Sequence, residues 1–215
     1  MGAPNMDFLV RESSYLFKDQ PMAFVRVGTC GIFKPNVAPG ALCLADKIYY
    51  CQRNYSYFDG NVTEGSSFSD SPYLISGPVK GDEELIEKIK SNLGKKDDVV
   101  VLKGPAISAE TFYSCQGRRF PDFSDENKSL VDTFVDLGVI GCEMESHQLY
   151  HLCKQRTDAN PKKTKTRAAS VCLGVVNRVD PSTPAHLTRQ SEESTKQTVL
   201  AAAGAALDAL ISLPL

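Results

Sequence analysis

Short apolar runs that alternate with helical patterns constrain the fold of this chain most strongly. Residues 99–102 (VVVL) are wholly apolar, as in strands buried on both faces of a sheet. Residues 82–93 (DEELIEKIKSNL) carry apolar side chains on one helical face, and Gly94 follows as a stop signal. An alternation of buried strands with amphipathic helices predicts helices layered on both faces of a sheet.

The same pattern recurs along the chain. We expect further strands at residues 23–27, 41–50, 139–142 and 169–176. We expect further helices at residues 125–137, 144–154 and 191–213, and a helical pattern near Phe8 at the start. Polar residues dominate 54–80 and 158–167, which are interpreted as surface connections. The predicted fold is a single α/β domain over residues 1–215: a three-layer α/β/α sandwich with a central mixed, largely parallel sheet.

Charge and composition exclude several function classes. The 215 residues carry a formal net charge of −2, which gives no electrostatic grip on nucleic acid or an anionic membrane. No apolar run approaches the roughly 20 residues that span a bilayer, and no signal peptide is recognisable. The seven cysteines form no CxxC pair, and an odd count without a secretory signal favours structural thiols in a reducing cytosol. We therefore expect a cytoplasmic protein with small-molecule ligands.

Unusual polar residues follow several predicted strands. They lie at Arg26–Gly31, Phe112–Arg118, Glu143–Glu145 and Asn177–Arg178. Ligands of α/β sheets collect beyond the carboxyl ends of the strands. Four such segments together therefore predict a polar cavity.

Each charged residue at these strand ends also has a simpler interpretation. The two glutamates could complement the positive end of a helix. Arg26, in an apolar strand, could pair with a core carboxylate or bind an anion through its planar guanidinium. Arg178 could equally close an ion pair at its strand. His147 and His151 have zinc-ligand spacing, but no third ligand follows a recognisable pattern.

Four segments in one order carry a resemblance to a known family. They are FVRVGTCG (24–31), ETFYSCQGR (110–118), GCEMES (141–146) and GVVNR (174–178). Together they resemble the nucleoside phosphorylase family and, through the Gln-Gly-Arg triplet, its uridine phosphorylases. The family also carries an N-terminal strand and a Gly-Asp-Pro phosphate loop, and no GDP tripeptide occurs here. The resemblance thus implies that the N-terminal part of the family domain is missing, and we expect activity to be reduced as a result.

The resemblance implies a role for each motif residue. It makes Arg26, Gln116, Arg118 and Glu145 the catalytic group. Phosphate would contact Arg26, Gly28 and Thr29, and the sugar would contact Met144 and Glu145. The remaining implied substrate-binding residues are Cys30, Gly31, Phe112, Gln116, Gly117, Arg118, Glu143 and Arg178.

The implied reaction is the reversible phosphorolysis of uridine to uracil and ribose 1-phosphate. Inorganic phosphate would be the co-substrate, with no cofactor and no metal, and the family forms homodimers or larger homo-oligomers. Two alternatives remain: a related nucleosidase that hydrolyses the N-glycosidic bond, and a nucleoside-binding homologue without catalysis. The nucleosidases depend on an aspartate general acid where this chain has Asn177 and Arg178.

Overall fold

The computed structural model describes residues 2–59, 70–94, 99–179 and 192–214. Its strands are β1 (Met22–Ile32), β2 (Leu42–Arg53), β3 (Tyr73–Lys80), β4 (Val101–Ala109), β5 (Gly141–Glu143) and β6 (Thr166–Asn177). Its helices are α1 (Ala3–Leu16), α2 (Tyr55–Asp59), α3 (Glu83–Leu93), α4 (Leu130–Asp136), α5 (Ser146–Ala159) and α6 (Glu192–Ile211), with a 3₁₀ turn, η1, at Ser114–Gln116.

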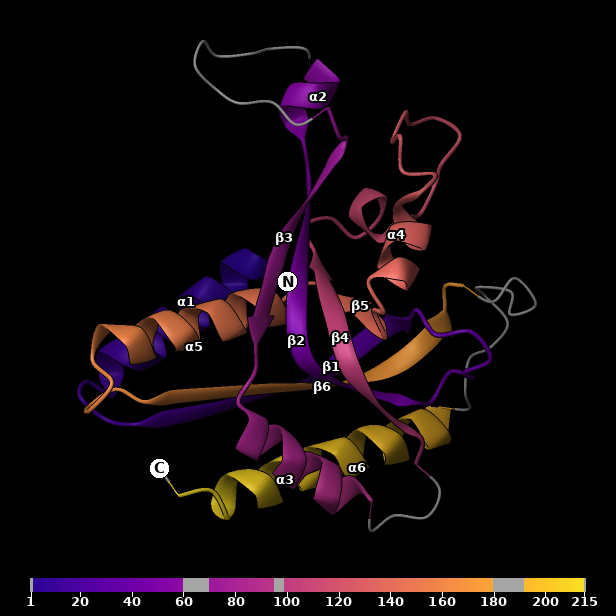
Figure 1. Ribbon diagram of the computed structural model, residues 1–215. Coiled ribbons are helices and arrows are strands. Elements are labelled where there is room, and N and C mark those ends of the chain that lie inside the picture. The colour runs from indigo at the N-terminus through magenta and orange to yellow at the C-terminus, as the bar shows by residue number, and fades with distance from the viewer. Residues whose placement is uncertain (1, 60–69, 95–98, 180–191, 215) are drawn as a thin grey trace.

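The strands form one mixed sheet between two helical layers, as predicted (Figure 1). The strand order is β3-β2-β4-β5-β1-β6, and an additional β2–β6 pairing curls the sheet back on itself. The two longest pairings, β1–β6 and β2–β4, are parallel, whereas β3 and β5 add antiparallel neighbours. Helices α1 and α5 cover one face, and α3 and α6 cover the other.

Helix α3 illustrates how sequence and packing agree. The Asp82 carboxylate accepts a hydrogen bond from the Leu85 backbone N–H at 2.9 Å, which caps the first turn. The four apolar residues of its inner face are buried against α6 and the sheet. Arg167 of β6 is buried and forms an ion pair with Glu84, so this face of the sheet is also tied to the helix through charge.

Several predicted boundaries differ from the structure, and two of them have identifiable physical reasons. Residues 54–80 were expected to be a surface connection, but their last part is β3, an edge strand antiparallel to β2. Gly77 and Pro78 obscured it, because edge strands tolerate residues that interior strands do not. Helix α4 begins later than predicted, since Glu126 has a left-handed φ of 48° that no helix accommodates. Residues 60–69 of the same stretch lie outside the described residues.

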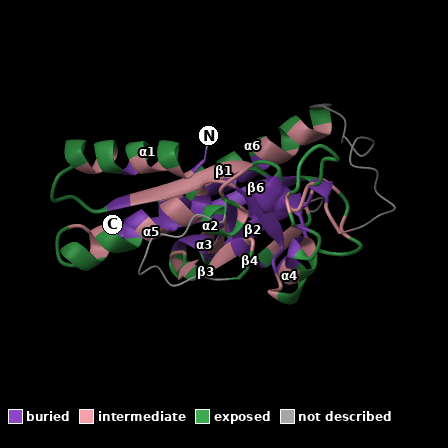
Figure 2. Cartoon of the chain, turned by 90° about the horizontal axis from the view of Figure 1, so that it is seen from above, coloured by how far each residue is buried: buried purple, intermediate pink, exposed green. Residues whose placement is uncertain are grey.

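Strand β1 supplies more residues to the site than any other single element, and it is longer than its sequence indicated. We expected it to end at residue 27, but it continues through Gly28–Gly31 to Ile32. It pairs with β6 along its length, but with β5 only through Gly31 and Ile32. Among the described residues, Met22–Cys30 therefore has no strand on its other edge. Most of this stretch is only half-buried (Figure 2). An edge of this kind can accept a further strand.

The route of β5 explains how distant segments meet. Because β5 runs antiparallel to β1, the chain that leaves it travels back along β1 towards Arg26. The convergence of polar residues was expected from parallel strands, but here an antiparallel step achieves it. No helix within the described ranges has the length and apolarity needed to cross a bilayer.

Candidate active site

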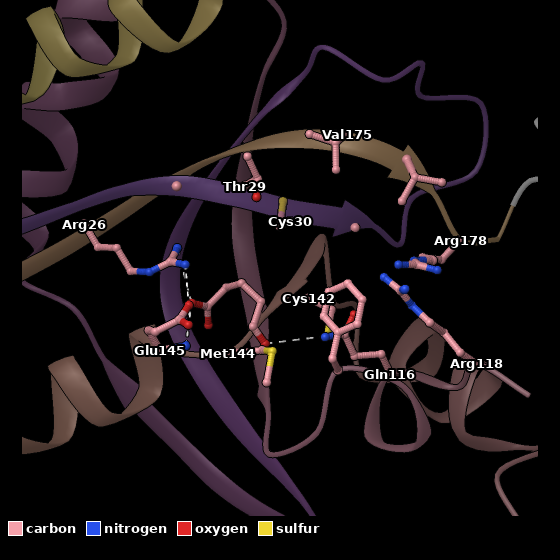
Figure 3. Close-up of a pocket in the computed structure, with 15 residues that line it drawn as sticks. Arg26, Thr29, Cys30, Gln116, Arg118, Cys142, Met144, Glu145, Val175 and Arg178 are labelled. Atoms are coloured by element: carbon pink, nitrogen blue, oxygen red, sulfur yellow. Dashed lines mark hydrogen bonds and ion pairs between the residues drawn. The ribbon is translucent and has the colours of Figure 1, made fainter. Parts of the chain in front are cut away.

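One cavity of about 450 Å³ gathers the predicted residues (Figure 3). Of the residues expected to bind substrate, only Gly117 does not line it. Gly117 instead ends the η1 turn with a left-handed φ of 72°. The predicted residues that line the cavity are Arg26, Gly28, Thr29, Cys30, Gly31, Phe112, Gln116, Arg118, Glu143, Met144, Glu145 and Arg178.

Three further lining residues were missed: Cys142, Val175 and Val176. Cys142 lies inside the GCEMES motif, so its neighbours could have indicated it. Val175 lies at a register shift, where Cys30 pairs with Gly174 but Gly31 pairs with Val176. A bulge of this kind re-aims one side chain, and its position cannot be read from apolar periodicity alone.

Two glycines of β1 make room for two arginines. A Cβ atom on Gly28 would lie 2.6 Å from the Arg26 guanidinium, and one on Gly31 would lie 2.9 Å from Nε of Arg178. Either would be a clash. The family resemblance implied that these glycines contact substrate, and the structure shows that they also make room for two arginine side chains. Two glycines of β1 thus each lie against a guanidinium, one from β1 itself and one from the chain just after β6.

Arg26 is neutralised by carboxylates from the end of β5. Its guanidinium donates to Glu145 and lies 3.3 Å from Oε2 of Glu143. It also donates to the Cys172 thiol at 2.8 Å. Burial by itself lowers the pKa of Arg26, but Cys172 and the two carboxylates outweigh that effect and raise it above its usual value. Pairing with a core carboxylate, one of the two interpretations open from the sequence, is therefore present in the structure.

Glu143 anchors the start of helix α5. Its carboxylate accepts hydrogen bonds from the backbone N–H groups of Glu145 and Ser146, each at 2.9 Å, and from the Ser146 hydroxyl at 2.8 Å. The Ser108 hydroxyl also donates to it, and itself accepts from the His147 N–H at 2.9 Å. These contacts satisfy N–H groups that a helix start leaves without partners. The helix-start interpretation thus describes Glu143.

Glu145 lies beside it but is held differently. One carboxylate oxygen accepts from Arg26, and the other accepts from the backbone N–H of Gly2 at 2.6 Å. Figure 3 shows this side chain directly beside Arg26, at one side of the cavity, with a dashed line joining the two. The opposite side of the cavity holds Gln116, Arg118 and Arg178.

Arg118 and Arg178 face each other without a carboxylate between them (Figure 3). None of the described acidic residues forms an ion pair with either, and Nε of each is buried without a hydrogen-bond partner. Burial, followed by the charge of Arg118, lowers the pKa of Arg178 to about 10. The Arg118 guanidinium lies 4.0 Å above the Phe112 ring, a cation–π contact. This end of the cavity therefore has an excess of hydrogen-bond donors and positive charge.

The loop that carries Gln116 and Arg118 is fixed by side-chain bonds. Asn127 donates to the carbonyl oxygens of Ser114 at 3.0 Å and Arg118 at 2.8 Å. The Cys115 N–H donates to the Thr111 hydroxyl at 3.0 Å. A segment held in this way can keep a glutamine amide and a guanidinium in one orientation.

The phosphorylase superfamily model matches residues 1–212. The chain belongs to this superfamily. A uridine phosphorylase of Haemophilus influenzae is 25% identical over 212 residues, covering 96% of this chain and 73% of that protein. A structure from work on two uridine phosphorylases of the oomycete Phytophthora capsici has a TM-score of 0.83 and 26% identity, and covers 100% of this chain and 74% of that one.

A Trypanosoma brucei nucleoside phosphorylase, described as showing uridine phosphorylase activity, shares the fold with a TM-score of 0.71 at 17% identity. That match covers 99% of this chain and 78% of the other. The family resemblance inferred from the four motifs is thus confirmed.

The surroundings of Asn177 and His147 bear on two interpretations of the sequence, the nucleosidase and the zinc site. Asn177 donates to the carbonyl oxygens of Lys34 and Val37, each at 2.8 Å, which ties the end of β6 to the chain after β1. The His147 ring stacks with the ring of Tyr50 and with that of His151. Within the described ranges, no group of three His, Cys, Asp or Glu residues is placed to hold a metal ion.

Proposed function

We propose that this chain catalyses the reversible phosphorolysis of uridine. The observation that carries the proposal is the order of groups along one cavity: Arg26 with Thr29 at one side, Glu145 next to them, and Gln116 with Arg118 and Arg178 opposite. A cavity of about 450 Å³ suits a ligand of nucleoside size. The similarity to uridine phosphorylases supports the choice of base.

Each part of the substrate has a chemically matched group in this arrangement. Phosphate would take the Arg26 guanidinium and the Thr29 hydroxyl, because a planar guanidinium binds oxyanions bidentately. The ribose hydroxyls would donate to Glu145, since an ionised carboxylate is an acceptor only. Gln116 would read the alternating carbonyl and N–H groups of uracil, because its amide both donates and accepts.

The proposed mechanism is positioning plus charge stabilisation. Phosphate held at Arg26 would lie on the sugar side of the cavity and attack C1′. As the glycosidic bond breaks, uracil gains negative charge, and Arg118 would donate to the carbonyl oxygen that receives it, with Arg178 beside it. Donors that face developing charge lower the barrier more than donors that bind the ground state.

The two unpaired guanidinium groups also favour uracil over cytosine. Uracil presents two carbonyl oxygens, whereas cytosine presents an amino donor where uracil has one of them. A donor placed against further donors would leave buried polar groups without partners, which costs about 1–3 kcal/mol each. We therefore expect cytidine to be a poor substrate.

Release of free base tests the proposal and its alternatives together. The protein is mixed with uridine, cytidine, inosine or 5′-methylthioadenosine, with and without phosphate, and free base is measured by chromatography. We expect uracil release from uridine only when phosphate is present. Phosphate-independent release of adenine would indicate a nucleosidase instead, and uridine binding without any base release would indicate a non-catalytic homologue.

A further inference from the structure

Two carboxylates two residues apart are held very differently at the acidic side of the cavity. The Glu143 side chain is 4% exposed and accepts from two backbone N–H groups and two hydroxyls at the start of α5. The Glu145 side chain is 15% exposed, and its carboxylate contacts Arg26 and the Gly2 N–H. Moving Glu143 would break the helix start, whereas moving Glu145 would break far fewer bonds.

Arg26 keeps other contacts if Glu145 moves away. Its guanidinium also contacts Glu143, at 3.3 Å, and the Cys172 sulfur, at 2.8 Å. Burial raises the pKa of Cys172 to about 12, so near neutral pH the thiol is uncharged and Glu143 is the remaining counter-charge of the arginine. Cys172 is itself held by Ser170, whose hydroxyl lies 2.7 Å from that of Ser146. The guanidinium therefore stays in place while one of its partners is exchangeable.

We propose that Glu145 is a two-position carboxylate that couples anion binding to nucleoside binding. In one position it neutralises Arg26, as in the structure. In the other, an oxyanion occupies the Arg26 guanidinium, and Glu145 turns to accept hydrogen bonds from a vicinal diol. The inference deepens the proposed function and rests on it for the identity of the diol.

Coupling follows because the two ligands compete with the same ion pair. An anion must displace Glu145 from Arg26, and a diol must draw Glu145 away from Arg26. Each ligand thus frees the group that the other one needs. Coupling between two ligands is reciprocal, and typical values lie at roughly 5- to 150-fold. The Arg26–Glu145 pair would also keep an anion from binding tightly before the nucleoside arrives.

Calorimetric binding of sulfate and uridine measures this coupling without turnover. Sulfate has the shape of phosphate, and titrating uridine with and without it gives the coupling directly. For the unchanged protein we expect sulfate to tighten uridine binding about tenfold. We expect no such effect on 2′,3′-dideoxyuridine, because it has no diol to receive Glu145.

The Glu145→Gln variant separates coupling from simple affinity. Its uncharged amide pairs weakly with Arg26, so sulfate alone should bind more tightly than to the unchanged protein. The uridine affinity should then no longer respond to sulfate. Glu87→Gln is the matched control, because Glu87, on α3, pairs with Lys103 of β4 rather than with a residue of this cavity. It should leave both affinities and their coupling unchanged.

Coupling that persists in Glu145→Gln, or sulfate that does not alter uridine binding to the unchanged protein, would overturn the inference. Failure of the proposed function looks different. If uridine does not bind at all while Glu145→Gln still tightens sulfate, the nucleoside assignment is wrong and competition between Glu145 and the anion is supported. Sulfate binding that does not respond to Glu145→Gln contradicts the competition itself.

Discussion

The two ends of the cavity treat a buried arginine in opposite ways. Arg26 and Arg178 each lie against a glycine of β1, but carboxylates neutralise Arg26, whereas Arg178 faces a second guanidinium. Burying a charge is costly unless it is paired. At the Arg26 end the protein supplies the partner. At the Arg178 end a ligand with electron-rich oxygens would supply it, which suits a base that gains negative charge as it departs.

Removing Arg26 should have the largest effect on both stability and activity. Arg26→Ala leaves Glu143 and Glu145 without their counter-charge, and breaking a buried pair costs about 3–5 kcal/mol. Phosphorolysis should fall below detection. Denaturant unfolding measures the first effect and uracil release the second. Arg11→Ala, which breaks an exposed pair with Asp7, serves as the control and should change stability by no more than about 1 kcal/mol.

Removing Arg178 should separate stability from activity. Arg178→Met deletes an unpaired cation beside Arg118, so the free energy of unfolding should rise by on the order of 1 kcal/mol. The kcat/KM for uridine should fall about 100-fold, because in the proposed mechanism positive charge beside the departing base is lost. A loss of stability like that of Arg26→Ala would contradict the difference between the two ends.

The aromatic contact of Arg118 should have a smaller effect, confined to the base. Phe112→Leu removes a cation–π contact of roughly 0.5–2 kcal/mol that holds the guanidinium in place. The KM for uridine should therefore rise several-fold while the KM for phosphate stays constant. Initial rates with each substrate varied in turn provide the measurement. An equal rise in both KM values would mean that the two ends are not separate subsites.

The last effect is absent at neutral pH and concerns the stability of helix α5, which follows the acidic end of the cavity. Burial, followed by the charge of His151, lowers the pKa of His147 to about 4. The folded protein therefore keeps His147 neutral, and the unfolded chain binds its proton more readily. This contribution to stability is complete above about pH 6.5 and is lost as the pH falls towards 4. His147→Phe should flatten the decline in melting temperature over this range, whereas Arg178→Met should not alter it.

Motifs and periodicity predicted much of this arrangement. The layers, helix α3 and the shared cavity could be predicted from apolar patterns and four motifs. Each of these patterns and motifs is local in sequence, so it can be recognised without the tertiary structure. The extension of β1 through Gly28–Gly31 could not be predicted, since in the sequence these glycines resemble a turn. Only the structure shows that Arg26 and Arg178 pack where a Cβ atom would lie. The different roles of Glu143 and Glu145 depend on the antiparallel path of β5, which is a tertiary feature.

A crystal structure with sulfate and uridine bound tests the central assignment most directly. The account predicts sulfate at Arg26 and Thr29, uracil against Gln116 and Arg118, and Glu145 turned towards the ribose. Charge alone would favour the opposite placement, because the unpaired guanidinium groups lie at the other end. Sulfate found between Arg118 and Arg178, with Glu145 still on Arg26, would contradict the assignment of the two ends.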